Sequence, residues 1–151
     1  MLLLGRFDAS GSAIIDISVS GDSGSKTYAA TIDTGFSGFV ALPFNEMIEL
    51  GLLVQGATNV LLGNGSIVAT PVSSGKASIG GQSATGTIVL DETSTEILIG
   101  MAFLREFKMA LVLTNSTVVL YDEHEALEAI TKFMAASPPG QPNTTPTAIG
   151  S

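Results

Sequence analysis

The stretch that decides the fold is Thr31 to Phe39, which reads TIDTGFSGF. An apolar run, TYAATI, leads into it and delivers Asp33 to a glycine turn with aromatic residues close by. Removing a carboxylate from water is costly unless it has a partner. Asp33 therefore needs a reason to stand where its neighbours are expected to be buried.

Length and composition limit what that reason can be. The chain has 151 residues, of which 45% are hydrophobic, and this predicts one globular domain. Fourteen acidic and six basic residues give a net charge of −8, and the basic residues form no cluster. Nucleic acids and anionic membrane surfaces are therefore excluded as expected partners. With no cysteine in the chain, disulfides, thiolate metal sites and a cysteine nucleophile are excluded too.

Two apolar segments bear on location. The opening MLLLGRFD is too short for the apolar region of a secretory signal. The most apolar run, ILIGMAFLREFKMALVL, is interrupted by Arg105, Glu106 and Lys108, which argues against a membrane span. We expect a cytoplasmic protein.

Short strands separated by turn residues fill most of the chain. AIIDISVS alternates apolar and polar residues, as a half-buried strand does, and TYAATI and FVALP read as further strands. FNEMIEL predicts a short helix that ends at Gly51. Runs on both sides of Gly80-Gly81, the run EILIG, a helix over MAFLREF, and a hairpin of KMALVL with TVVLYD complete the pattern.

The segment TNVLLGNGSIVATPV carries the strongest hairpin signal, because Asn64-Gly65 stands between apolar-rich arms. We predict a type I′ turn there, which needs positive φ at both residues.

The C-terminal part of the chain has two segments. Residues 123–136 have Leu127, Ile130 and Met134 at helical intervals, together with Phe133, and predict an amphipathic helix. Residues 137–151 are rich in Pro and Thr and read as a flexible tail.

In this order, the features resemble the retropepsin-like aspartic proteases. The resemblance covers about residues 10–122 and rests on a strand that delivers Asp33-Thr34-Gly35, a glycine-tipped hairpin, and EILIG ahead of a helix. It implies a mostly-β protein with a closed β-barrel, short helices and one Asp-Thr-Gly motif per subunit. We expect the protease domain at 1–122, the C-terminal helix at 123–136 and the tail at 137–151.

The resemblance also implies a mechanism. Two close carboxyl groups share a proton, so that one acts as base on a water and the other as acid toward the peptide. A chain with one motif needs a second copy, so a homodimer is implied, with Asp33 as the catalytic carboxyl on the two-fold axis. Thr34 is expected to hydrogen-bond across the interface, and Gly35 to allow close backbone approach.

The same resemblance implies a flap at Leu61 to Ile67 that closes over a peptide or protein substrate. Gly100 is expected to pack beneath the Asp33 loop. The expected substrate-binding residues are Phe36, Ser37, Leu62, Gly63, Asn64, Gly65 and Ser66. An apolar flap, with Phe36 and Phe39 beside the pocket, favours hydrophobic side chains around the scissile bond.

Three positions depart from the retroviral members of the family. Ser37 and Met101 stand where an Asp and an Arg commonly form an ion pair, and Phe36 replaces a small residue. These departures keep open a catalytically silent dimer of the same fold that binds peptides or scaffolds partners. A third possibility is a monomeric β-barrel interaction domain in which the Asp-Thr-Gly motif is accidental.

Other chemistries fit the sequence poorly. Ser37 lies in GFSGF, but a nucleophile elbow needs glycine where Phe39 stands. GNGSIV lacks the third glycine of a dinucleotide fingerprint. In YDEHE the acidic residues suit a helix N-terminus better than a metal site, and His124 reads as a surface residue. We therefore expect no metal and no cofactor.

Overall fold

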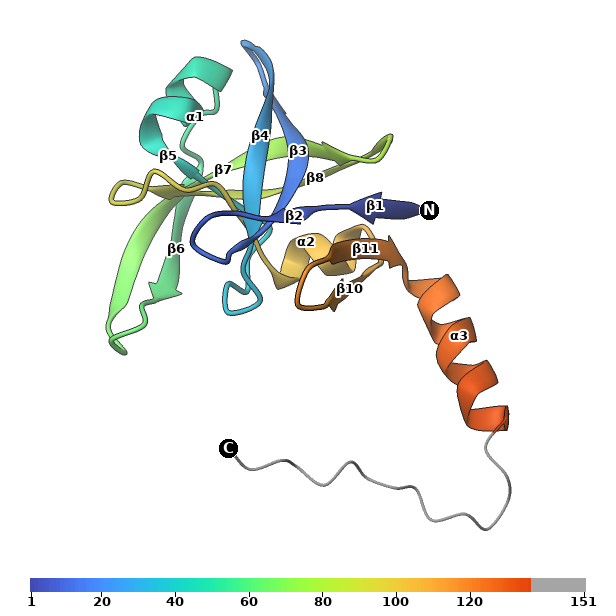
Figure 1. The fold of residues 1–151 in the computed structure, drawn as a ribbon. Helices are drawn as coiled ribbons and strands as arrows, with labels where there is room; N and C mark the ends of the chain where they lie inside the picture. Colours follow the sequence, from blue (N-terminus) through green and yellow to red (C-terminus); the bar gives the residue numbers. More distant parts are fainter. Residues whose placement is uncertain (137–151) are drawn as a thin grey trace.

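A computed structural model describes residues 1–136, so the expected tail at 137–151 lies outside the described residues. This part of the chain is mostly β, with short helices and one C-terminal helix (Figure 1). The strands are β1 (Leu2–Leu4), β2 (Arg6–Phe7), β3 (Ala13–Gly21), β4 (Gly24–Ile32), β5 (Val40–Pro43), β6 (Gly56–Leu61), β7 (Ile67–Ile79), β8 (Gln82–Asp91), β9 (Leu98–Ile99), β10 (Met109–Leu113) and β11 (Val118–Asp122). The helices are α1 (Phe44–Leu50), α2 (Met101–Glu106) and α3 (Glu123–Ala136).

Six of the strands close into a barrel, in the order β3-β4-β9-β5-β8-β7. The pairing of β7 with β3 closes it, with Val19 opposite Ala77. Most neighbours are antiparallel, but β4 with β9 and β5 with β8 are parallel pairs that require long connections. The closed, mostly-β barrel expected from the sequence is therefore confirmed.

The alternation in β3 shows why these residues form the barrel. Ile15, Ile17 and Val19 are buried in the core, whereas Asp16 between them is exposed. One face of the strand thus supplies apolar side chains and the other meets solvent, as the period of two requires. Phe39, Phe103 and Phe107 fill the core beside the barrel, with the rings of Phe103 and Phe107 centred 4.6 Å apart.

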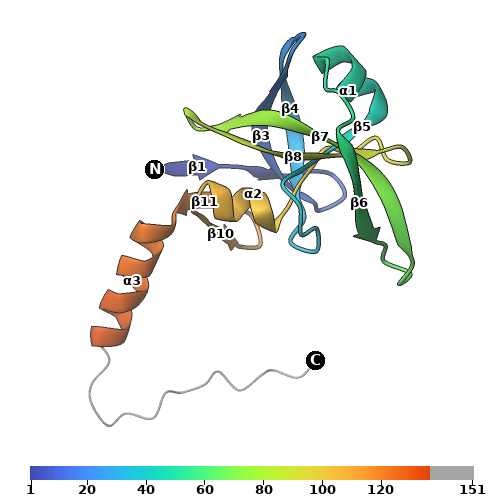
Figure 2. The same cartoon turned by 180° about the vertical axis from the view of Figure 1, so that it is seen from behind.

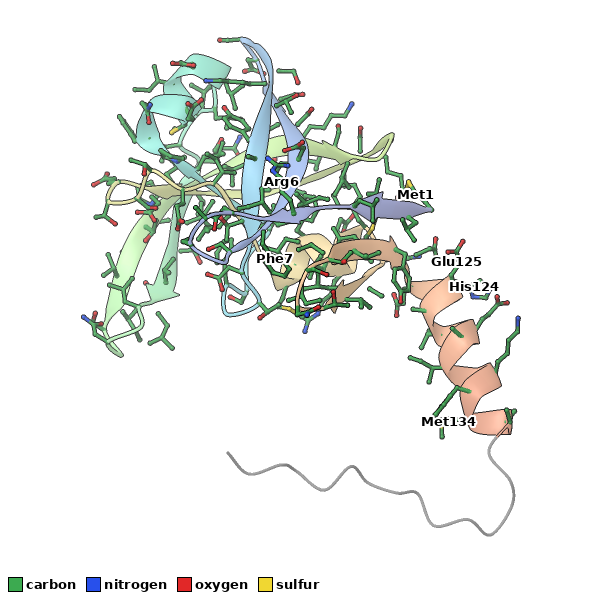
Figure 3. The ribbon with its side chains drawn as sticks, in the orientation of Figure 1. Met1, Arg6, Phe7, His124, Glu125 and Met134 are labelled. Atoms are coloured by element: carbon green, nitrogen blue, oxygen red, sulfur yellow. The ribbon has the colours of Figure 1, made fainter. Side chains whose placement is uncertain are left out.

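A second sheet has the order β1-β11-β10. The sequence did not predict its first strand: β1, from the opening residues, pairs with β11 so that Leu3 lies opposite Leu120. The amino group of Met1 also reaches the carboxylate of Glu125 in α3, 3.3 Å away, and both residues are labelled in Figure 3. The first residues of the chain are thereby tied to the last elements of the described part.

The short helix α1 ends as predicted, with Gly51 in the left-handed conformation at φ 69°. An ion-pair cluster fastens it to β4: the ammonium of Lys26 lies 2.8 Å from Glu46 and 3.0 Å from Glu49. The hydroxyl of Tyr28 also donates to Glu46 over 2.7 Å. Hydrogen bonds from Lys26 and then Tyr28 lower the pKa of Glu46.

The C-terminal helix α3 projects away from the barrel in both views (Figures 1 and 2). Its apolar residues recur at helical intervals, but the structure buries none of the helix. Leu127 and Ile130, for example, are each more than half exposed. Within residues 1–136, no helix combines the length and hydropathy needed to cross a membrane.

The hairpin between β6 and β7 forms, but its turn is not the predicted type I′. Leu61 pairs with Ile67, and the amide of Gly65 donates to the carbonyl of Leu62 over 2.9 Å. Gly63 and Asn64 are therefore the central residues, and only Gly65 in this turn has positive φ, at 84°. This is the geometry of a three-residue loop with a glycine bulge. Positive φ at two successive residues occurs instead at Gly80-Gly81, between β7 and β8.

Candidate active site

Asp33 follows the last residue of β4 and begins the loop that leads to β5. Its amide donates to the carbonyl of Ile99 in β9 over 3.0 Å, which fixes the backbone at the end of the parallel pair. The amide of Gly35 donates to the Asp33 Oδ1 over 2.9 Å. The carboxylate is half-buried and held in one orientation, with its neighbour Ile32 in the core.

Hydrogen bonds from the first residues of α2 hold the rest of this loop. The amide of Met101 donates to the carbonyl of Phe36 over 2.8 Å, and the amide of Ala102 donates to that of Gly38 over 3.1 Å. Gly100 is buried and lies against the same two carbonyl groups, where a Cβ atom would collide with both. The close packing of Gly100 beneath the loop, expected from the sequence, is confirmed.

A cavity of about 1220 Å³ opens beside Asp33. The loop after β4 lies between the projecting β6–β7 hairpin on one side and α2 on the other, as both views show (Figures 1 and 2). The β6 side of the hairpin contributes the lining residues from Thr58 to Gly63, together with Gly65. A cavity of this size, open to solvent, has room for several side chains of an extended peptide.

The structure brings most of the predicted site residues to this cavity. Those that line it are Asp33, Gly35, Phe36, Ser37, Leu62, Gly63 and Gly65. Thr34, Asn64 and Ser66 are exposed and are not among the lining residues. Asn64 and Ser66 instead bond to each other within the turn, where the Ser66 hydroxyl donates to Asn64 Oδ1 over 2.6 Å.

Several residues that line the cavity were not predicted from the sequence. Leu98 and Ala102 add an apolar surface near the Asp33 loop. Strand β8 contributes Thr85, Gly86, Thr87, Val89 and Asp91. Their alternation along TGTIVLD was visible in the sequence, but nothing local indicated which face of this strand would meet the cavity.

Comparisons with known proteins bear on this arrangement. No protein-family model matches the sequence, and no curated protein matches it significantly. Solved structures do match. A retropepsin-like aspartic protease from Rickettsia conorii superposes with a TM-score of 0.59 at 18% identity, covering 80% of this chain and 89% of that one.

The chain has a retropepsin-like fold. The EIAV protease, solved in complex with the inhibitor HBY-793, agrees with a TM-score of 0.55 at 14% identity, and 98% of its chain is covered, against 71% of this one. Both of these structures are of proteases. Within the retropepsin-like fold of this chain, the cavity lies beside the single Asp-Thr-Gly turn.

Proposed function

We propose that this protein is an aspartic endopeptidase that acts as a homodimer, with Asp33 of each subunit as the catalytic carboxyl. The observation that carries the proposal is the position of Asp33, whose carboxylate accepts a hydrogen bond from the Gly35 amide and lines a large cavity together with residues of the β6–β7 hairpin. The retropepsin-like fold supports it, because the solved neighbours are aspartic proteases.

The chemistry requires a second carboxyl group. A single carboxylate can accept a proton from water but offers no acid for the leaving amine, whereas a close pair that shares one proton offers both. Thr34 and Gly35 are exposed next to Asp33, on the part of the loop that a second subunit would reach. We infer that a two-fold axis passes near this exposed turn and brings the two Asp33 side chains together.

In the proposed reaction, one Asp33 takes a proton from a water molecule, and this water attacks the peptide carbonyl. The other Asp33, protonated, stabilises the developing negative charge and then supplies a proton to the leaving nitrogen. The amide of Gly35 keeps its own subunit's carboxylate in position, since it donates to Oδ1. The hairpin tip closes over the peptide and excludes bulk water.

The absence of the ion pair at Ser37 and Met101 does not loosen the loop. Backbone hydrogen bonds hold this turn, and they run from the amides of Met101 and Ala102 to carbonyl groups of the loop. A charge at only one of the two positions would lack its partner, so replacing both together is consistent. Phe36 lines the cavity and, with Leu98, forms an apolar surface that suits hydrophobic side chains near the scissile bond.

The test is a digest of a mixed peptide library at pH values from roughly 4 to 7, read by mass spectrometry. Wild type is compared with Asp33→Asn and with Asp16→Asn, a control with the same chemical change at an exposed carboxylate that pairs with Arg6. We expect cleavage by wild type and the control but not by Asp33→Asn. If none of the three proteins cleaves any peptide, although light scattering shows that they are dimeric, the proposal is overturned in favour of the catalytically silent peptide-binding dimer.

The expected cytoplasmic location remains a prediction. Fractionation of cells that express the tagged chain would test it, and recovery of the protein outside the cytoplasmic fraction would contradict it.

The division into a protease domain at 1–122 and a separate helix at 123–136 is likewise proposed. It predicts that a chain ending at Asp122 keeps a cooperative unfolding transition, since α3 buries none of its residues.

A further inference from the structure

One face of strand β8 forms a wall of the cavity. Thr85, Thr87, Val89 and Asp91 occupy every second position of β8, and all four line the cavity. Between them, the side chains of Ile88 and Leu90 point the other way and are fully buried in the core, whereas Gly86 has no side chain and also lines the cavity. This wall therefore presents two hydroxyl groups and the side chain of Val89, and it ends in a carboxylate.

The Asp91 carboxylate is fixed in place. The amide and the hydroxyl of Thr93 donate to its Oδ1 over 2.9 and 2.8 Å, and the amide of Ser94 donates to the same oxygen over 3.1 Å. These bonds hold the side chain at the end of the strand and engage one of its two oxygens. A turn of this kind needs one acceptor oxygen, which Asn or Ser would also supply. The turn therefore does not explain the negative charge.

The charges around the cavity all have the same sign. Among the residues described as lining it, the ionisable ones are Asp33, Asp91 and Glu106, and none is basic. The described residues 1–136 contain no salt bridge to Asp91, whereas Lys26 and Arg6 pair with carboxylates elsewhere. The half-buried Asp91 thus leaves an uncompensated negative charge at the wall of the cavity.

We propose that Asp91 forms a subsite that binds a basic side chain, Lys or Arg, of the peptide substrate. Such a side chain has a long aliphatic stem and a charged end. The stem fits against Val89 and the methyl groups of the two threonines, and the cation reaches the free oxygen of Asp91. This inference rests on the proposed function and deepens it: the substrate carries hydrophobic residues beside the scissile bond and a basic residue at one flanking position.

The experiment uses peptides that the library digest shows to be cleaved. Lysine is placed in turn at each flanking position, and each peptide is paired with one that carries norleucine, which has a similar stem without the charge. At one position, wild type should cleave the lysine peptide about fivefold to tenfold faster in kcat/KM than its norleucine pair. Asp91→Asn, which keeps the acceptor for the turn, should bring this ratio close to one, and Asp91→Lys should lower it below one, because the two like charges repel.

Glu92→Gln is the matched control, because Glu92 is the adjacent exposed carboxylate and does not line the cavity. It should keep the wild-type ratio. A ratio near one at every position in an active wild-type enzyme, or a ratio that survives Asp91→Asn, would overturn the subsite alone.

If no peptide is cleaved, the proposed protease function fails, and the subsite is tested by binding. The probes are then fluorescently labelled peptides from the library, each made in a lysine form and a norleucine form, and fluorescence polarisation measures their binding to wild type and to Asp91→Asn. Tighter binding of a lysine peptide that is lost in Asp91→Asn supports the subsite, and equal binding of both peptides overturns it.

Discussion

Gly100 lies so close to the backbone of Phe36 that no side chain fits between them. A Cβ atom on Gly100 would overlap the carbonyl oxygens of Phe36 and Gly38 and come within 2.7 Å of the Phe36 ring. The amide of Met101 bonds to the same Phe36 carbonyl, so this oxygen cannot move away without breaking a bond. The glycine at the start of α2 therefore sets the position of the loop that carries Asp33.

The first prediction follows for Gly100→Ala. Because the opposing atoms are backbone, we expect a loss of about 1 to 3 kcal/mol in the free energy of unfolding and a larger relative loss of peptidase activity. Gly56→Ala is the control, since a Cβ there meets only a Val72 methyl group at 3.9 Å. Urea unfolding of both variants checks this, and equal stability of the two would contradict the close packing.

The second prediction concerns the two hairpin glycines. Gly65 has φ 84° in open space, so Gly65→Ala should cost about 1 kcal/mol through the left-handed backbone alone. A Cβ atom on Gly63 would have no neighbour within 4 Å, and its φ is not positive, so Gly63→Ala should leave stability nearly unchanged. Gly65→Asn should recover part of the loss, because Asn tolerates this conformation. Thermal unfolding of the three variants checks this, and equal losses for Gly63→Ala and Gly65→Ala would contradict the positive φ of Gly65.

The third prediction tests the shared site. When wild type and Asp33→Asn are unfolded together in equal amounts and refolded, half of the wild-type chains should pair with an inactive partner. Activity per wild-type chain should then fall to about half, because only dimers with two Asp33 carboxyls are active. Asp16→Asn in place of Asp33→Asn should cause no loss. Full activity per wild-type chain in the Asp33→Asn mixture would show that one chain suffices.

The fourth prediction concerns pH and Glu46. Its folded pKa is lowered from 4.5, so the stability that its ionised form contributes is present above pH 4.5 and is lost as the pH falls through the folded value. Glu46→Gln should therefore cost about 1 kcal/mol at neutral pH and almost nothing in strong acid. Glu49→Gln, at a more exposed carboxylate that bonds only Lys26 among the described residues, should cost less at neutral pH.

The chemical unfolding of wild type and both variants at neutral and acidic pH measures this difference. A Glu46→Gln penalty of equal size at both pH values would mean that the charge of Glu46 does not stabilise the fold. The cluster of Lys26, Tyr28 and Glu46 would then stabilise the fold through packing and through hydrogen bonds that do not depend on this charge.

The hairpin between β6 and β7 shows how far local signals reach. Asn64-Gly65 predicted a hairpin in the right place, because glycine and asparagine favour turns. The turn type depends on which strand residues pair. Leu61 pairs with Ile67, and the amide of Leu62 donates to the carbonyl of Ser66, so three residues remain for the loop instead of two.

Features that depend on neighbouring residues could be predicted without the structure. Backbone preferences and burial within a few positions explain the alternation of β3, the end of α1 at Gly51 and the Asp33-Thr34-Gly35 turn.

Features that depend on distant pairings emerged only in the folded chain. Asp91 reaches the cavity because β8 pairs with β5, which the Asp33 loop precedes. Strand β1 joins β11 from the opposite end of the described chain. Such pairings arise from the packing of the whole core, which no short stretch of sequence encodes.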